Sequence, residues 1–285
     1  MPKVYRPVDS DQIILLGYLT LVEPANLVAK NTMYSKDAFQ GKIVAVTGAG
    51  SGVGRALARL YSQAGASVAI LDIEDERLAQ TASDLTDEGA NVLKIVGDVS
   101  DPNYCANAID QVVNHCGGID VLCNVAGIVS FRAIADVDPS FWRKHFAVNV
   151  DGPFFLSQAA LPHLTKTGGN IVNVASSAAL VGEAFLVPYA ASKAALVHMT
   201  KSMAMELVNE NVRINAVAPG AIDTNIMAGQ TFPDNIDFDL VSRYTGLRAA
   251  SSPEEIAEFI AYISSPMASS IHGACLSIDG GITAG

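Results

Sequence analysis

The sequence predicts a doubly wound α/β fold, in which a seven-stranded parallel sheet is flanked by helices on both faces. Two observations support this prediction. From Gly41 onward, seven short apolar runs alternate with segments of helical periodicity. Each run is apolar at both odd and even positions, which is typical of strands buried on both faces of a sheet. Alternation of such strands with helices indicates right-handed βαβ units.

The seven predicted strands are each bounded by Gly, Asn or Asp. In chain order they are KIVAVTG (42–48), ASVAILD (66–72), NVLKIVGD (91–98), GIDVLCN (118–124), GNIVNVAS (169–176), VRINAVAPG (212–220) and GACLSIDGG (273–281). Between them lie helical windows such as GRALARLYSQAG (54–65) and SKAALVHMTKSMAMELVNE (192–210). Together these elements predict a single domain over residues 41–285.

Residues 1–40 lie outside this alternation. Their apolar run IILLGYLTLV (13–22) is about half of the ~20 residues that a membrane-spanning helix needs. Asp9 and Asp11 precede it where a signal peptide would carry basic residues. We expect an arm that packs on the domain or on a neighbouring subunit; a lid over the active site is the alternative.

The composition excludes several classes of partner. Of the 285 residues, 50% are hydrophobic and 16% are charged, and the net charge is −11. This acidity argues against a nucleic-acid partner and against an anionic membrane surface. The four cysteines lack metal-ligand spacing, so we expect free thiols in a reduced, cytoplasmic setting and no metal site. They are Cys105, Cys116, Cys123 and Cys275.

The stretch TGAGSGVG, residues 47–54, joins the first predicted strand to the first predicted helix. There, exposed backbone N–H groups and the positive end of the helix can hold a pyrophosphate. The spacing Gly48-x-x-x-Gly52-x-Gly54 differs from the common G-x-G-x-x-G pattern, and a glycine-rich turn without a ligand is the alternative. The expected contacts from this loop are Gly48, Ser51, Gly52, Val53 and Gly54.

The end of the second predicted strand points to the cofactor NAD. Asp72 stands eighteen residues after Gly54, where its carboxylate can accept hydrogen bonds from ribose hydroxyls and would repel a 2′-phosphate. Ile73 stands where an Arg would favour NADP. The alternative is that Asp72 only caps its strand. Asp98 could bond the adenine edge, or simply be a turn aspartate.

Four motifs occur in order: TGAGSGVG, NVAG (124–127), NVASS (173–177) and YAASK (189–193). With them the chain resembles the short-chain dehydrogenase/reductase family over about residues 41–283. The resemblance implies a Rossmann-like cofactor-binding and catalytic domain, a secondary alcohol or ketone as substrate, and a homotetramer or homodimer.

Tyr189 and Lys193 are four residues apart, so on a helix they face the same way. By the resemblance, Tyr189 is the general acid–base. Lys193 would hold the nicotinamide ribose and, with the bound nicotinamide cation, lower the pKa of the phenol from about 10 to about 7. The family's serine stands thirteen residues before its tyrosine, which selects Ser176, with Ser177 in reserve.

The resemblance also implies that the backbone carbonyl of Asn149 holds a water in a proton relay. The sequence offers its own reason, because Pro153 has no N–H to give to that carbonyl. The other expected cofactor contacts are Val99, Asn124, Ala126, Gly127, Pro219, Gly220, Ile222 and Thr224.

A long loop rich in Met, Phe and Ile follows the sixth predicted strand, and we expect a substrate lid at about residues 223–250. We expect substrate contacts from Ser176, Val129, Ala178, Phe185 and Met227. Glu183 is expected to face solvent, with a substrate contact as the alternative. The sequence thus predicts an NAD-dependent oxidoreductase for a hydrophobic, terpenoid- or steroid-like alcohol or ketone. A non-catalytic NAD-binding regulator and an epimerase or lyase are the alternatives.

Overall fold

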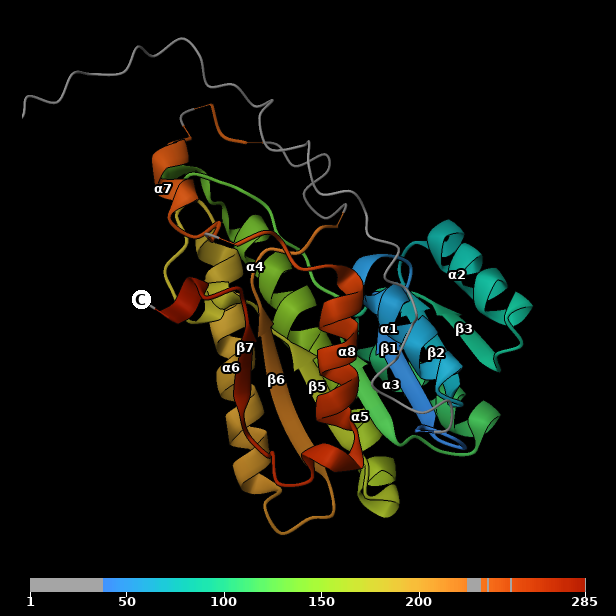
Figure 1. Ribbon diagram of the computed structural model, residues 1–285. Coiled ribbons are helices and arrows are strands. Elements are labelled where there is room, and N and C mark those ends of the chain that lie inside the picture. Colours follow the sequence, from blue (N-terminus) through green and yellow to red (C-terminus); the bar gives the residue numbers. More distant parts are fainter. Residues whose placement is uncertain (1–37, 225–231, 235, 247, 285) are drawn as a thin grey trace, which may run out of the picture. The chain divides into compact units, whose positions relative to one another are not determined.

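The computed structural model describes residues 38–224, 232–234, 236–246 and 248–284. Its sheet has seven strands in the order β3-β2-β1-β4-β5-β6-β7, and every neighbouring pair is parallel. The predicted fold class is therefore confirmed (Figure 1). The strands are β1 (Ile43–Thr47), β2 (Ser67–Asp72), β3 (Val92–Val96), β4 (Val121–Asn124), β5 (Asn170–Val174), β6 (Arg213–Pro219) and β7 (Cys275–Ile278).

Helices cover both faces of the sheet. They are α1 (Gly52–Gln63), α2 (Asp75–Asp87), α3 (Pro102–Cys116), α4 (Pro139–Phe146), α5 (Gly152–Thr167), α6 (Val187–Glu206), α7 (Phe238–Ser242) and α8 (Pro253–Ser264). Short 3₁₀ turns lie at Ile134–Asp136, Ser177–Ala179, Pro266–Ala268 and Ile282–Ala284. Local sequence explains several helix starts. For example, Ser252 and Glu255 form a reciprocal capping box at the start of α8.

The two larger cores, one on each face of the sheet, explain why the central strands carry apolar residues at both odd and even positions. Val44 and Val46 of β1 enter the core beneath α1, α2 and α8, whereas Ala45 enters the core beneath α3 and α5. Figure 1 shows α1 and α8 on the face of the sheet turned to the viewer. Because the central strands are covered on both sides, polar alternation along them would bury unpaired polar groups. The edge strands β3 and β7 are partly exposed.

The strand order reverses beside β1, since β2 and β3 lie on one side of it and β4 to β7 on the other. In open α/β sheets, a ligand crevice forms at such a switch point, beyond the carboxyl ends of the strands. The strands β1, β2, β4, β5 and β6 all end at this edge, so the segments that follow them begin there. The topology therefore brings the sequence motifs together.

Parts of the predicted organisation fall on residues that the structure does not describe. The expected arm lies outside the described residues up to position 37, and the expected lid at about 223–250 lies partly outside them.

Phe39 is buried and packs edge-on against Tyr61 with ring centroids 4.8 Å apart. Within the described ranges, no helix is both long and apolar enough to cross a membrane.

The four cysteines are free thiols, as expected.

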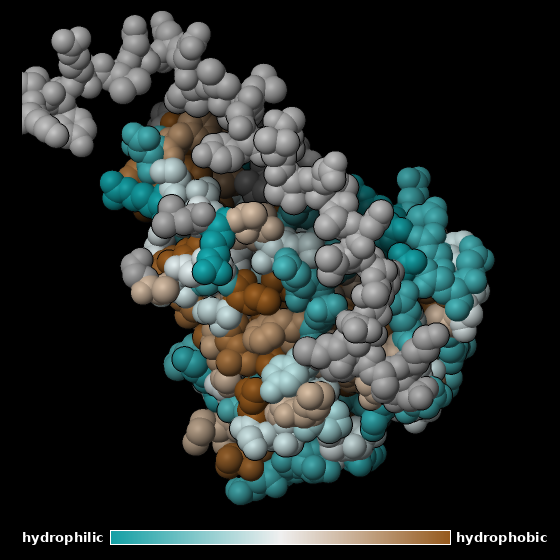
Figure 2. All heavy atoms as spheres, in the orientation of Figure 1, coloured by the Kyte–Doolittle hydropathy of each residue, from teal (hydrophilic) through white to brown (hydrophobic). Residues whose placement is uncertain are grey.

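On the face seen in Figure 2, hydrophilic residues gather over α2, and hydrophobic residues gather over the side of β6 and β7.

Candidate active site

The glycine loop between β1 and α1 closes on itself so tightly that its glycine positions have little room for a side chain. A Cβ atom on Gly54 would collide with the carbonyl oxygen of Gly48, which itself has φ +67°. Ser51 precedes α1, but its side chain makes no capping hydrogen bond, and the first turn holds no acidic residue. The N-terminal N–H groups of α1 are thus left for an external anion. Val53 is buried beneath the turn.

Asp72, at the end of β2, is tied to the same loop. One carboxyl oxygen accepts a hydrogen bond from the Gly50 N–H at 2.9 Å, and the other accepts one from the Glu74 N–H at 3.0 Å. Asp72 therefore does cap the end of its strand, which was the alternative interpretation of this residue. It does not exclude ribose binding, since a carboxylate accepts about four hydrogen bonds. Sequence reasoning missed Gly50, whose position beside Asp72 leaves no space for a Cβ.

The expected cofactor contacts that follow β2 and β3 differ in burial. Asp98 is exposed and accepts a hydrogen bond from the Ser100 N–H at 2.9 Å, as a turn aspartate does. Val99 is buried and packs against Gly152. Ile73, after β2, is exposed.

Thr47 joins the glycine loop to the segment after β4. Its hydroxyl oxygen accepts hydrogen bonds from the N–H groups of Val125 and Ala126, each at 2.9 Å. Asn124 is buried, and its amide nitrogen donates to the Asn173 side-chain oxygen at 2.8 Å. The Asn124 side chain therefore ties β4 to β5 and α5 inside the protein. Only the backbone of Asn124 is left to contact a cofactor.

The strand β5 ends in two serines with different partners. Ser176 hydrogen-bonds the Tyr189 side chain, whereas the Ser177 hydroxyl donates to a carboxyl oxygen of Glu183 at 3.3 Å. Tyr189 lies in the first turn of α6, and Pro188 starts this helix near the end of β5. The structure thus pairs Ser176, rather than Ser177, with the tyrosine, in agreement with the thirteen-residue spacing.

Lys193 lies one turn beyond Tyr189 on α6 and is buried. Its ammonium group donates to the carbonyl oxygen of Val174 at 2.7 Å, and burial lowers its pKa to about 8. The ammonium lies 5.9 Å from the centroid of the Tyr189 ring.

The expected pKa of about 7 for Tyr189 applies to the cofactor-bound enzyme, and in the chain alone this pKa lies above the ordinary value of 10. Burial raises it to about 12, the charge of Glu183 adds to the rise, and the hydrogen bond from Ser176 opposes it. The phenol is therefore a neutral acid before cofactor binds. Because Lys193 is bonded to Val174 rather than to the phenol, the positive charge of a bound nicotinamide would have to add to that of the lysine to lower the pKa.

Asn149 lies in a π-helical segment, Ala147–Asp151, between α4 and α5. Its side-chain oxygen accepts from the Ile128 N–H at 2.9 Å, and its amide donates to the Ser192 hydroxyl at 3.0 Å. A Cβ on Gly127 would lie 3.2 Å from both the Asn149 side-chain oxygen and the Lys193 nitrogen. The asparagine, the lysine and the segment after β4 therefore meet at one point.

The segment after β6 reaches across to the glycine loop. Pro219 is the last residue of β6, and Gly220 packs against Asp279 too closely for a side chain. Ile222 forms a parallel bridge with Ser251. The Thr224 side chain lies near Gly52, since a Cβ on that glycine would be 3.3 Å from the threonine methyl group.

Aromatic side chains gather on the substrate side. The ring of Phe131 lies 4.9 Å from that of Phe232, and Phe232 lies 5.8 Å from Phe238. These contacts join the segment after β4 to residues of the expected lid. Phe185 has φ +65°, a strained value for a residue with a side chain.

The remaining expected substrate contacts are placed as follows. Val129 is half-buried after β4, and Ala178 is buried in the turn after Ser176. Met227 lies outside the described residues.

The expectation that Glu183 faces solvent is wrong. Its side chain is buried, with 9% of the residue exposed, beside Ser177. Burial raises the pKa of this carboxyl to about 7. Its neighbours in sequence, Gly182 and Ala184, gave no signal of burial, because the groups that cover it come from distant segments.

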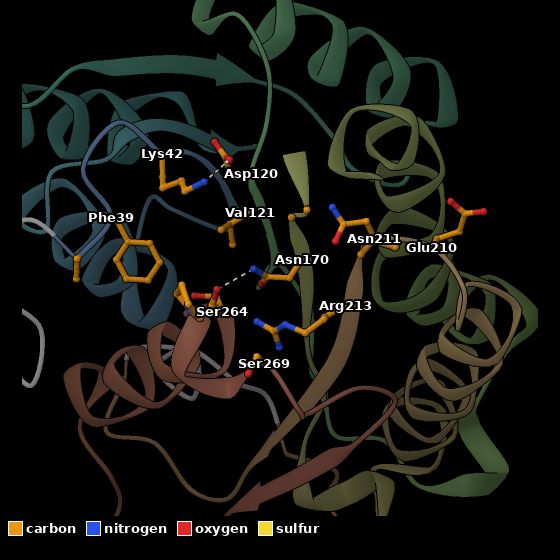
Figure 3. Close-up of a pocket in the computed structure, with 15 residues that line it drawn as sticks. Phe39, Lys42, Asp120, Val121, Asn170, Glu210, Asn211, Arg213, Ser264 and Ser269 are labelled. Atoms are coloured by element: carbon orange, nitrogen blue, oxygen red, sulfur yellow. Dashed lines mark hydrogen bonds and ion pairs between the residues drawn. The ribbon is translucent and has the colours of Figure 1, made fainter. Parts of the chain in front are cut away.

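A cavity of about 400 Å³ lies away from these motifs, at the amino ends of β1, β4, β5 and β6. Figure 3 shows Lys42 paired with Asp120 and the Asn170 amide paired with Ser264 at this cavity. None of the predicted site residues lines it.

The residues at the switch point fit a dinucleotide. The glycine turn admits close approach, the N-terminus of α1 can receive a pyrophosphate, and Asp72 stands where the adenosine ribose would lie. Lys193 and Tyr189 lie on the opposite side of β1, near the expected nicotinamide end.

Comparison with known proteins agrees with this geometry. A family model described as Enoyl-(Acyl carrier protein) reductase matches residues 48–283. The chain is 39% identical over 246 residues to meso-2,3-butanediol dehydrogenase of Serratia marcescens, covering 86% of this chain and 96% of that protein. It is 38% identical over 250 residues to cis-4-hydroxycyclohexanecarboxylate dehydrogenase of Sinomonas cyclohexanicum, covering 87% and 99%.

Two solved structures are similar in fold, each covering 86% of this chain and 99% of the other, with a TM-score of 0.78. They are the 3-ketoacyl-(acyl-carrier-protein) reductase of Brucella melitensis complexed with NADH, at 29% identity, and a short chain dehydrogenase of Burkholderia cenocepacia J2315 in complex with NADP, at 33%. The chain belongs to the short-chain dehydrogenase/reductase family, whose members are oxidoreductases that act on alcohols and ketones with a nicotinamide cofactor.

Proposed function

We propose that the protein is an NAD-dependent dehydrogenase of hydrophobic cyclic secondary alcohols. The observation that carries this proposal is the hydrogen bond between Ser176 and Tyr189, one helical turn from the buried ammonium of Lys193. This pair stands at the carboxyl edge of the sheet, where the glycine loop and Asp72 also lie. A hydroxyl group held there meets both a hydrogen-bond donor and an acid–base group.

Each side chain has a role in alcohol oxidation. Ser176 binds the substrate oxygen, and Tyr189 as phenolate takes the hydroxyl proton. A nicotinamide held beside Lys193 and the glycine loop would supply the acceptor for the hydride of the carbinol carbon. Lys193 stabilises the phenolate and holds a ribose hydroxyl. The Asn149 carbonyl, which cannot receive an N–H from Pro153, binds the water that passes the proton on from Lys193.

The preference for NAD rests on Asp72. Its carboxylate stands at the end of β2 with Ile73 exposed beside it, and no basic side chain pairs with it in the described structure. A 2′-phosphate would meet a like charge here, whereas a 2′-hydroxyl would meet an acceptor.

The substrate class rests on the aromatic side chains of Phe131, Phe232 and Phe238, which are suited to a ring. A similar dehydrogenase, that of Sinomonas cyclohexanicum, is named for a hydroxycyclohexane carboxylic acid. Residues of the expected lid at about 223–250 contribute part of this apolar surface. A terpenoid- or steroid-like alcohol or ketone fits the same chemistry.

Association into a homodimer or homotetramer is part of the proposal. Apolar side chains are exposed on α5 and just beyond α6, where Phe154 is 37% and Val208 is 57% exposed. A copy of the chain would cover them. The free thiols fit a reducing compartment such as the cytoplasm. Analytical ultracentrifugation across a concentration series tests the assembly.

The direct test follows NADH absorbance at 340 nm with NAD or NADP and a panel of cyclic secondary alcohols. Wild type and Tyr189→Phe are compared, with Tyr262→Phe on α8 as a matched control. We expect wild type and the control to form NADH, and Tyr189→Phe to lose ~10²-fold or more in kcat. Tight NADH binding without turnover on any alcohol would instead favour a regulator. Product formation without net NADH would favour an epimerase or lyase.

A further inference from the structure

Glu183 is a buried carboxyl group for which the proposed mechanism has no use. It forms none of the ion pairs in the described part of the chain. Its one hydrogen bond there, from the Ser177 hydroxyl at 3.3 Å, occupies a single carboxyl oxygen. The second oxygen has no partner among the described residues, yet it is not sealed from solvent. It can therefore be reached by a ligand.

The carboxyl group lies beside the reacting groups. Its bonded partner Ser177 adjoins Ser176, and its charge acts on Tyr189 and on Tyr244. Glu183 is thus at the substrate end of the site rather than at the dinucleotide end. The groups facing it are a serine and two tyrosines, and the cation nearest the reaction, Lys193, is bonded elsewhere.

The loop that carries Glu183 is fixed from several sides. The Tyr244 hydroxyl donates to the carbonyl of Ala184 at 2.7 Å, and the Arg132 N–H donates to the carbonyl of Phe185 at 2.8 Å. The loop also includes the strained backbone of Phe185. Strain of this kind persists where surrounding contacts over-determine the conformation, and it concentrates at ligand sites. The carboxyl group is therefore held in place before substrate arrives.

We propose that Glu183 is a specificity-determining residue, which accepts a hydrogen bond from a second hydroxyl group of the substrate. The preferred substrates are then diols or hydroxylated ring alcohols, rather than simple hydrophobic alcohols. This inference rests on the proposed function and narrows its substrate class. A purely apolar substrate would leave the carboxyl group desolvated and unpaired, and an anionic substrate would meet a like charge. A hydroxyl donor satisfies it in either protonation state.

The test compares cyclohexanol with 1,2-, 1,3- and 1,4-cyclohexanediol as substrates. The measured quantity is the ratio of kcat/KM for the best diol to kcat/KM for cyclohexanol, corrected for the number of reactive hydroxyls. We expect a ratio of at least about 10 for wild type, which corresponds to about 1.4 kcal/mol, because only the diol gives the buried carboxyl group a hydrogen-bond donor. Glu183→Leu should bring the ratio near 1, and Glu183→Gln, which keeps an acceptor oxygen, should give an intermediate value.

Glu206→Gln is the matched control, because Glu206 is exposed and lies about 25 Å along α6 from Tyr189. It should keep the wild-type ratio. NADH binding by fluorescence shows that each variant is folded. A wild type that oxidises cyclohexanol as well as every diol, or a Glu183→Leu variant with the wild-type ratio, refutes the inference and leaves the dehydrogenase standing. A wild type that oxidises none of the four alcohols and none of the larger cyclic secondary alcohols of the panel refutes both.

Discussion

The ammonium group of Lys193 donates a hydrogen bond to the carbonyl oxygen of Val174 across 2.7 Å. Val174 is the last residue of β5, two residues before Ser176. The bond therefore joins the strand that presents the serine to the helix that presents Tyr189. Although burial lowers its pKa to about 8, the lysine stays mostly protonated at pH 7.

Lys193→Met should lose at least ~10²-fold in kcat, because the phenolate of Tyr189 loses its neighbouring positive charge. Steady-state oxidation at pH 7 measures this. Lys201→Met is the control, since Lys201 is exposed two turns further along the same helix. If Lys193→Met kept more than about a tenth of the wild-type kcat, the assigned role of the lysine would be wrong.

Asp72→Asn should shift cofactor use toward NADP. The amide keeps an acceptor oxygen for only one of the N–H groups of Gly50 and Glu74, and it removes the charge that repels a 2′-phosphate. We expect the ratio of kcat/KM for NAD to that for NADP to fall about tenfold, or ~1.4 kcal/mol. Asp110→Asn, an exposed site on α3, serves as control. An unchanged ratio would mean that Asp72 only caps its strand.

Gly127→Ala should damage the site through crowding. The added methyl group would lie 3.2 Å from both the Asn149 oxygen and the Lys193 nitrogen, so one of them must move. We expect kcat to fall about tenfold and the free energy of unfolding to fall by about 1–3 kcal/mol. In Gly118→Ala the nearest atom is the Ile43 methyl group at 3.9 Å, so this control should behave as wild type. Equal behaviour of the two variants would contradict the observed packing.

Glu183 should make stability depend on pH. Its folded pKa of about 7 exceeds the ordinary value of 4.5, so the folded state holds the proton more tightly than the unfolded state. Its contribution is complete below pH 4.5 and is lost as pH rises through 7, by at most about 3 kcal/mol. Tyr189 and Tyr244, which face it, have pKa values raised to about 12 and do not titrate in this window.

Urea unfolding of wild type and Glu183→Gln from pH 5 to pH 8 measures this effect. The amide does not titrate, so the free-energy difference between the two proteins should shift in favour of the variant as pH rises. A constant difference across the range would show that the carboxyl group is not desolvated.

The sheet and the glycine loop could be predicted because their causes are local. Each buried strand is a mainly apolar run bounded by turn residues, and Gly54 is required by its contact with Gly48 within the same loop. The contacts of Gly48, Gly50 and Gly52 come from distant segments, but the glycine pattern itself is visible in the sequence. The pairing of Ser176 with Tyr189 followed from the serine–tyrosine spacing that the family resemblance implies. The environments of Glu183 and Asn124 could not be predicted, because Tyr244, Ser157 and Asn173 reach them from other elements.

The pKa of Tyr189 shows the same limit. Its motif predicts a helix face shared with Lys193, and the structure has that face. In the chain alone, burial and the carboxyl group of Glu183 nevertheless raise the pKa of Tyr189 to about 12, against the hydrogen bond of Ser176. A local pattern places a group, but the surrounding charges decide when it ionises.

The π-helical segment around Asn149 also sets how the side chains of α5 are rotated about the helix axis relative to those of α4. Each residue of an α-helix advances the chain by about 100° around the axis, so a wider turn shifts every later side chain in angle relative to the earlier ones. Deleting one residue within Ala147–Asp151 would restore a regular helix, but it would rotate the inward face of α5 away from α3. Apart from Asn149, whose buried side chain is hydrogen-bonded to Ile128 and Ser192, this segment should therefore tolerate changes of side chain better than changes of length.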